Sequence, residues 1–251
     1  MYLLDSLTTM INKSSRDEPR YWFACYVLEH TADVADMNIE VLAKNCNTSA
    51  ASVSRLVTEL GCENYRAFRE HCRLFANSYA NLREQSVDAG AMRPDNVRNF
   101  MERELLPSLT AIPMEAVCQV ADFLEGDVYL VGMATMRAIT TKLQAYIWMN
   151  EERKIFLPNQ TGELRTLQEK DHVIVFSGTG RLFIETDLVE NLKATRARKM
   201  LLTTTKNDNA ASMQLFDEIV RIPAETGSTW LIHHLYSFFI DMVTDEMYRR
   251  G

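Results

Sequence analysis

The chain has 251 residues, of which 24% are charged and 47% are apolar, and 27 Lys and Arg residues stand against 34 Asp and Glu residues. This composition is close to the globular average and excludes disordered, collagen-like and coiled-coil proteins. The formal charge of −7 argues against non-specific coating of nucleic acid, which needs dense Lys and Arg, but leaves room for a small DNA-reading module within an acidic protein.

Helical periodicity dominates the first half of the chain. It predicts four helices, over about 17–30, 39–46, 50–60 and 64–77. Asn38 and Ser49 are the expected N-cap residues of the second and third helices, and Gly61 favours the left-handed backbone that ends the third. The second and third helices, joined by a tight turn at Asn47-Thr48, are predicted to form a helix-turn-helix unit.

The third of these helices is expected to leave a small, hydroxyl-bearing face outward, which can enter a DNA major groove without a clash. Five of the eight basic residues in 1–78 lie between 44 and 73, although this segment also holds ten acidic residues. Arg55 has competing structural explanations, an ion pair with Glu59 or an internal brace for the turn. The candidate DNA-contacting residues are Ser49, Ala50, Ser52, Ser54, Arg55 and Thr58.

Residues 82–125 are expected to form connecting helices, with apolar periodicity over 96–109 and 114–124. Five short apolar runs then follow, at 128–132, 154–157, 172–176, 199–203 and 218–222. Helical stretches at 135–149 and 182–195 alternate with these runs, which predicts strands buried on both faces in a parallel, doubly wound sheet. A last helix over 229–250 is expected to place Leu235, Phe238 and Phe239 on its apolar side.

The chemistry of such a sheet is expected at the carboxyl ends of its strands. The third run leads into Ser177-Gly178-Thr179-Gly180 and then a helix, and the fourth ends in Thr203–Lys206. Glycines that permit close backbone approach, hydroxyl donors and free helix N–H groups together suit a phosphate or carboxylate. Taken alone, however, a four-residue turn of Gly, Ser and Thr is more often a plain turn than an anion site.

The cysteines are odd in number and form no CxxC pair, so we expect reduced thiols and neither a disulfide framework nor a metal site. They are Cys25, Cys46, Cys62, Cys72 and Cys118. No stretch approaches the roughly 18 apolar residues that a membrane helix requires, and the first 20 residues contain no apolar run suited to a signal peptide. These features predict a soluble cytoplasmic protein without a membrane partner.

The predicted helix-turn-helix segment and the two strand-end loops resemble those of the RpiR-type transcriptional regulators. Proteins of that family join an N-terminal helix-turn-helix domain to a C-terminal sugar isomerase (SIS) domain. Residues 49–56, Ser-Ala-Ala-Ser-Val-Ser-Arg-Leu, resemble the family pattern S-x-A-T-V-x-R-F, and Leu60-Gly61 resembles the LG that follows it. The strand Val128–Gly132 resembles the one that leads to G-x-G-x-S. The loop Ser177–Gly180 resembles S-x-S-G-x-T, the sugar-phosphate loop, and Asp241 fits the family's last helix.

The resemblance implies an all-α helix-turn-helix domain over 1–78, linker helices over 79–110, and an α/β domain over 111–251. The α/β domain is expected to be a three-layer αβα sandwich around a five-stranded parallel sheet. Its implied ligand-binding residues are Gly132, Met133, Thr135, Met136, Ser177, Gly178, Thr179 and Gly180. Ala134, Met136 and Leu182 replace the family's second glycine, serine and threonine, which implies a weaker, altered or absent effector site.

The implied function is that of a sequence-specific DNA-binding regulator of carbohydrate-use genes, with a duplex operator as one partner and a phosphorylated sugar or related anion as its effector. The chain is expected to form a homodimer or a homotetramer, to need no cofactor and to have no catalytic residues. The alternatives are a sugar-phosphate isomerase, a non-catalytic sugar-phosphate-binding protein and an interaction module. Isomerisation needs a general base, and Glu163 and His172 lie outside any recognisable catalytic pattern. His233 and His234 face different sides of a helix, which makes them a poor metal pair.

Overall fold

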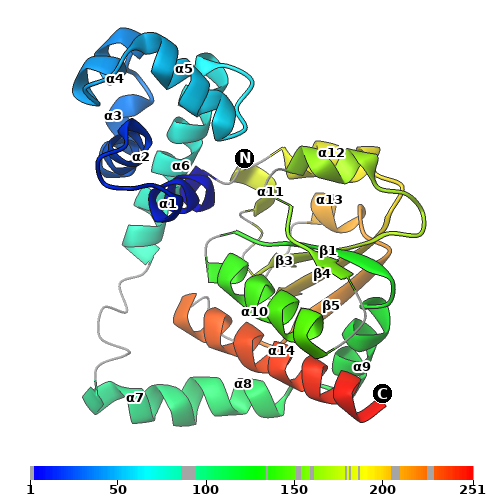
Figure 1. The fold of residues 1–251 in the computed structure, drawn as a ribbon. Coiled ribbons are helices and arrows are strands. Elements are labelled where there is room, and N and C mark those ends of the chain that lie inside the picture. Colours follow the sequence, from blue (N-terminus) through cyan, green and yellow to red (C-terminus); the bar gives the residue numbers. More distant parts are fainter. Residues whose placement is uncertain are drawn as a thin grey trace. The chain divides into compact units, whose positions relative to one another are not determined.

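The computed structural model describes residues 3–85, 94–133, 135–150, 154–158, 161–178, 180, 182–185, 187–204, 210–224 and 229–250. The chain divides into two compact units, residues 1–85 and residues 86–251 (Figure 1). The first unit is entirely helical in its described part, and the second is built on a sheet. Among the described helices, none combines the length and the apolar character that crossing a membrane would require.

The first unit contains α1 (Leu3–Lys13), α2 (Pro19–Glu29), α3 (Thr31–Val34), α4 (Ile39–Asn45), α5 (Ala50–Glu59) and α6 (Tyr65–Gln85). The four predicted helices correspond to α2, α4, α5 and α6, and α6 continues eight residues beyond the predicted end at 77. The sequence analysis missed α1, which packs against α2 and buries Leu3, Leu7 and Met10. Its apolar residues recur at helical spacing, but a short amphipathic helix depends on a packing partner that only the fold supplies.

The core of the first unit joins the helix-turn-helix pair to the flanking helices. Leu42 and Ala43 of α4 and Val53 and Val57 of α5 are all buried in one apolar cluster. Phe23 of α2 and Phe68 of α6, both fully buried, lie in the same cluster with their ring centroids 5.9 Å apart. The two short helices, predicted as a helix-turn-helix unit, therefore pack on each other, and their contact is continuous with the core of the rest of the unit.

The second unit begins with α7 (Pro94–Phe100), a π-helical turn η1 (Met101–Leu105), α8 (Leu106–Thr110) and α9 (Met114–Phe123). The alternating part contains β1 (Asp127–Val131), α10 (Thr135–Asn150), β2 (Lys154–Phe156), the 3-10 helix η2 (Thr161–Thr166) and β3 (His172–Ser177). It continues through α11 (Leu182–Glu185), α12 (Leu188–Ala194), β4 (Arg198–Thr204), α13 (Ala210–Met213), β5 (Glu218–Ile222) and α14 (Thr229–Arg250). All five predicted strands are confirmed to within a residue or two at their ends, whereas the helix predicted over 182–195 is two short helices.

The five strands form one parallel sheet in the order β2-β1-β3-β4-β5. Figure 1 shows α9, α10 and α14 on one side of this sheet and α11, α12 and α13 on the other. Alternate residues of the strands join α9, α10 and α14 in one apolar cluster; those of the four longer strands are Val128, Leu130, Ile174, Phe176, Met200, Leu202, Val220 and Ile222. The predicted three-layer αβα sandwich with five parallel strands is thus confirmed.

The last helix, α14, buries Leu235 and Phe239 completely but leaves Phe238 44% exposed. Leu235 and Phe239 are four residues apart and share a helix face, whereas Phe238 points about 100° away from Phe239. The prediction that Phe238 belongs to the apolar side of this helix was wrong for that reason.

Burial separates the five cysteines into two classes. It raises the pKa of the Cys46 and Cys62 thiols to about 11 and that of Cys72 to about 12, while Cys25 and Cys118 are only half-buried. Because the thiolate is the reactive form, we expect iodoacetamide at pH 8 to modify Cys25 and Cys118 in the folded protein and to spare the other three. Peptide mass spectrometry before and after denaturation checks this, and equal labelling of all five in the folded state would contradict it.

Candidate functional site

The helix-turn-helix pair is capped as the sequence predicts. The Asn38 side chain accepts a hydrogen bond from the Val41 backbone N–H at 2.8 Å, and Ser49 Oγ accepts one from the Ser52 N–H at 3.1 Å. Asn47, in the turn between α4 and α5, and Gly61, after α5, have positive φ angles of 50° and 90°. These local interactions set the length of both helices and the tightness of the turn.

The outward face of α5 contains the predicted DNA-contacting residues. Ser54, Arg55 and Thr58 are exposed, while Ala50 and Ser52 are half-buried. Three hydroxyls are engaged locally: Ser49 Oγ caps the helix and lies 2.9 Å from Ser52 Oγ, and Thr58 Oγ1 donates to the Ser54 carbonyl at 3.1 Å. The Ser54 and Arg55 side chains are exposed on the surface of the unit.

Arg55 does not form the ion pair with Glu59 that the sequence left open. Glu59 Oε1 instead accepts from Arg20 Nη1 of α2 at 3.0 Å. Within the described part of the chain Arg55 has no hydrogen-bond or ion-pair partner, so its guanidinium has all its donors available.

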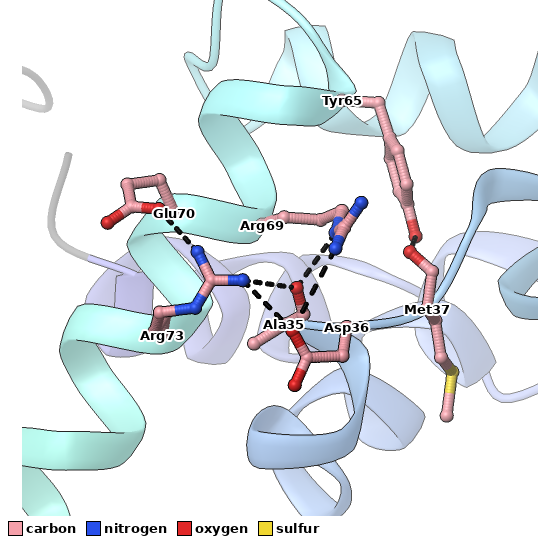
Figure 2. Close-up of polar contacts among 7 residues, drawn as sticks. All are labelled: Ala35, Asp36, Met37, Tyr65, Arg69, Glu70 and Arg73. Atoms are coloured by element: carbon pink, nitrogen blue, oxygen red, sulfur yellow. Dashed lines mark hydrogen bonds and ion pairs between the residues drawn. The ribbon is translucent and has the colours of Figure 1, made fainter.

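The basic residues around α5 do not all contribute to an open basic patch. Figure 2 shows Arg69 and Arg73 of α6 directed at the Ala35–Asp36 segment of their own unit. Arg69 Nε donates to the Ala35 carbonyl at 2.8 Å, and Arg73 Nη2 donates to the same oxygen at 3.1 Å. Of the five basic residues counted between 44 and 73, two are therefore engaged inside the unit, and Lys44, Arg55 and Arg66 remain exposed.

The second candidate site lies in the sheet unit, where the two predicted loops meet. β1 and β3 are neighbours in the sheet, and their register pairs Val131 with Val175. Gly132 is therefore level with Phe176, and the loops that follow both strands leave the same carboxyl edge side by side. In the order β2-β1-β3-β4-β5 the chain connections reverse between β1 and β3, which is the switch point where open α/β sheets bind ligands.

The loop after β3 is held by its neighbours on both sides. Thr203 Oγ1 donates to the Ser177 carbonyl and Thr204 Oγ1 to the Gly178 carbonyl, each at 2.7 Å. A Cβ atom at position 178 would lie 2.5 Å from Ile232 Cγ2 of α14. Glycine at 178 is therefore favoured by packing inside the chain and not only by the approach of a ligand, and this packing cannot be read from the sequence because Ile232 is distant along the chain.

The remaining predicted ligand-binding residues lie on both loops. Gly132 packs closely on α10, since a Cβ atom there would lie 3.0 Å from Met136 Cβ, and Met133 is half-buried. Met136, 8% exposed, belongs to the apolar core, and Gly180 has a positive φ of 77°. Thr179 and Ala134 lie outside the described residues, as do Thr205 and Lys206 after β4; Thr135 opens α10, and its side chain is not described.

Arg137 is a residue at this edge that the sequence analysis missed. It lies in the first turn of α10, and its guanidinium donates to the Pro158 carbonyl at 2.9 Å and the Leu157 carbonyl at 3.3 Å. A cation is unfavourable near a helix N-terminus, so an arginine two residues into a predicted helix was a signal that it meets acceptors or an anion. Here it ties the end of β2 to the start of α10, at the same carboxyl edge of the sheet as the two loops.

Of the residues weighed for catalysis or metal binding, His172 and Glu163 lie outside the two loops, whereas His233 and His234 follow Ile232, which packs against Gly178. His172 begins β3, at the amino edge of the sheet, where Nδ1 is 2.8 Å from the Phe123 carbonyl and the ring lies against Phe123. Glu163 is exposed on η2. Among the described residues no group of three or more His, Cys, Asp or Glu side chains could hold a metal ion.

Solved structures with a similar fold contain sugar isomerase domains. One match is the sugar isomerase domain of an RpiR transcription factor from Sphaerobacter thermophilus. The aligned region covers 64% of this chain and 91% of the Sphaerobacter chain, at 17% identity and a TM-score of 0.50. A second match is phosphoheptose isomerase GmhA from Neisseria gonorrhoeae. The aligned region covers 61% of this chain and 96% of the Neisseria chain, at 15% identity and a TM-score of 0.50. These likenesses establish the fold of the sheet unit alone.

One likeness extends along nearly the whole chain. The Vibrio vulnificus NanR protein, in complex with ManNAc-6P, covers 99% of this chain and 92% of that chain at 16% identity, but its TM-score of 0.47 is too low to add to the argument. No protein-family model and no curated protein matches the sequence.

The contact between Gly178 and α14 predicts a specific stability effect. We expect Gly178→Ala to lower the free energy of unfolding by about 1–3 kcal/mol, since the added methyl group must displace Ile232. Gly162→Ala is the control, because a Cβ atom at 162 meets nothing within 4 Å. Urea unfolding measures both, and equal stability of the two variants would contradict the packing role of Gly178.

Proposed function

We propose that this protein is a sequence-specific DNA-binding transcriptional regulator of the RpiR type, controlling carbohydrate-use genes in response to a phosphorylated sugar. The observation that carries the proposal is the coexistence in one chain of a capped helix-turn-helix pair with an unpaired, exposed Arg55 and a SIS-like sheet with two loops at its switch point. The first feature suits a major groove, and the second suits a phosphate.

The DNA-binding part of the proposal rests on shape more than on charge. The exposed face of α5 is small and polar, so the helix backbone can approach base edges closely. With Arg69 and Arg73 engaged internally, the unit has few bases for phosphate contacts, and a shallow salt dependence follows. A homodimer, or a homotetramer built from dimers, would offer paired α5 helices to two operator half-sites and supply the missing affinity.

The effector part of the proposal rests on the switch point and on fold likeness. The proteins of similar fold include the domain of an RpiR transcription factor and phosphoheptose isomerases, which points to a phosphorylated sugar as the ligand class. Ser177 and the Arg137 guanidinium lie at the edge where such a phosphate would bind. Met136, buried where the family has a serine, removes one hydroxyl donor and favours an effector that differs from the family's usual ligand.

We propose a sensing role for this domain and no turnover. The isomerase alternative needs a general base beside the bound sugar. His172 begins β3 at the opposite edge of the sheet, with Nδ1 2.8 Å from the Phe123 carbonyl, which argues against His172 as that base.

Arg55 tests the DNA-binding part. We expect Arg55→Gln to weaken binding to a duplex, selected by the full chain from a random-sequence pool, by about 1–3 kcal/mol. Arg98→Gln, which removes an exposed arginine from α7 of the sheet unit, should leave the affinity unchanged. Gel-shift titration measures both, and wild-type affinity of Arg55→Gln would contradict the role given to Arg55.

A panel of sugar phosphates and amino-sugar phosphates tests the effector part. A ligand at about 100 times its Kd should stabilise the folded protein by about 2.7 kcal/mol and raise Tm accordingly. We expect the unphosphorylated sugars to have no effect and Ser177→Ala to reduce the shift. Equal shifts from phosphorylated and unphosphorylated sugars would contradict recognition through the phosphate.

A further inference from the structure

Three side chains of α6 end on the short segment that leads from α3 into α4 (Figure 2). Tyr65, Arg69 and Arg73 are spaced four residues apart, so they form one stripe along the helix. Besides the two arginine contacts with the Ala35 carbonyl, Arg73 Nη2 is 3.0 Å from Asp36 Oδ1, and Tyr65 Oη donates to the Met37 carbonyl at 3.2 Å. We call this set of contacts with Ala35, Asp36 and Met37 the α6 clamp.

The acceptors of the α6 clamp are groups that need a partner. Ala35 is 3% exposed and follows the end of α3, where the carbonyl groups have no partner within the helix. Two N–H donors from charged side chains meet this one oxygen, and charge-assisted hydrogen bonds are about twice as strong as neutral ones. The clamp therefore holds the backbone of this segment in one position relative to α6.

The clamped segment leads directly into the helix-turn-helix pair. Asn38, the next residue after Met37, caps α4, and Asn45 at the far end of α4 donates to Tyr26 Oη of α2 at 2.6 Å. α4 is thus held at both ends by other helices of the unit. α5 packs on α4 through buried side chains. The orientation of α5 therefore depends on the position of α4, which the clamp fixes.

The same contacts argue against a direct role for these arginines at a phosphate backbone. Arg73 is shared among the Ala35 carbonyl, Asp36 and Glu70, the last at 2.5 Å. Asp36 also lies 3.9 Å from Arg69. Two carboxylates beside two guanidinium groups leave little net positive charge with which to attract DNA.

We propose that Tyr65, Arg69 and Arg73 are positioning residues that orient α4 and α5 for specific DNA binding without contacting DNA themselves. This inference rests on the proposed DNA-binding function. Loss of the clamp should therefore reduce discrimination between sequences, because misplaced base contacts carry specificity whereas phosphate contacts carry non-specific affinity.

The test compares Arg69→Gln/Arg73→Gln and Tyr65→Phe with the wild-type full chain, after thermal melting shows the folded fraction of each. Tyr65→Phe removes one hydroxyl and no charge, so it keeps the proposal testable if the double variant does not fold. Arg66→Gln is the matched control, since Arg66 is an exposed arginine of the same helix without a partner among the described residues. The DNA probes are a duplex selected by the wild-type chain from a random-sequence pool and its scrambled counterpart.

For the double variant we expect about a tenfold higher Kd for the selected duplex. The Kd for the scrambled duplex and the slope of log K against log salt should be unchanged, and amide hydrogen exchange across 36–46 should be faster. Tyr65→Phe should show a smaller change in the same direction. Arg69→Lys keeps the charge but loses the Nε–H donor, so it should show part of the change seen in the double variant, because the Arg73 and Tyr65 contacts remain.

Two results would overturn this proposal. One is a wild-type ratio of selected to scrambled affinity in both the double variant and Tyr65→Phe. The other is a salt slope that falls by about one for each arginine removed, which would show direct phosphate contacts. If the wild-type chain selects no duplex at all, the proposed DNA-binding function is wrong. If the wild-type chain selects a duplex and the variants keep the same specificity, only the proposed role of the clamp is wrong.

Discussion

Burial of both faces of a five-stranded parallel sheet is the constraint on which the second unit depends. Parallel strands need crossover connections, and their two apolar faces must each be covered by helices. Alternate residues along β1, β3, β4 and β5 pack into one cluster with α9, α10 and α14, while the opposite residues face the other helix layer. In a parallel sheet the carboxyl ends of all strands lie at one edge. The loops that contain polar and glycine residues are therefore close in space there, although they are distant in sequence.

The last helix, α14, packs against both β4 and the loop after β3. Its Ile232 occupies the space above Gly178, and Tyr236, fully buried, donates from its hydroxyl to the Leu202 carbonyl of β4 at 2.9 Å. Thr203 and Thr204 of the same strand hold the carbonyls of the β3 loop. The candidate ligand loop is therefore built against a helix that lies about 50 residues away in the sequence. A ligand at this loop can act on the protein only to the extent that it binds two arrangements of these elements unequally.

In the helical unit, hydrogen bonds and ion pairs determine which basic side chains remain available at the surface. Counting residues suggests a basic patch around α5, but the contacts of Arg69 and Arg73 convert two of its members into internal braces. Glu59 likewise pairs with Arg20 and leaves Arg55 unpaired. A surface with few available bases favours recognition of base edges over attraction to the phosphate backbone, which agrees with the net charge of −7.

The sequence by itself determined the elements whose cause is local. Asn38, Ser49 and Gly61 mark helix ends because a cap or a left-handed residue acts within a few positions, and the five strands are recognisable because apolar runs of that length occur between turn residues. The resemblance to known regulators added the expected sandwich and the two loops, and the fold agrees with it.

Only the tertiary structure decided the partners of side chains that are distant in sequence. It revealed α1, which needs α2 to bury its apolar face, and it exposed Phe238, which the helical phase of α14 turns away from the core. It also placed Ile232 against Gly178, Arg137 at the candidate ligand edge, and Arg69 and Arg73 on the Ala35 carbonyl. Composition and spacing record which groups a chain carries, but which donor meets which acceptor depends on how its elements pack.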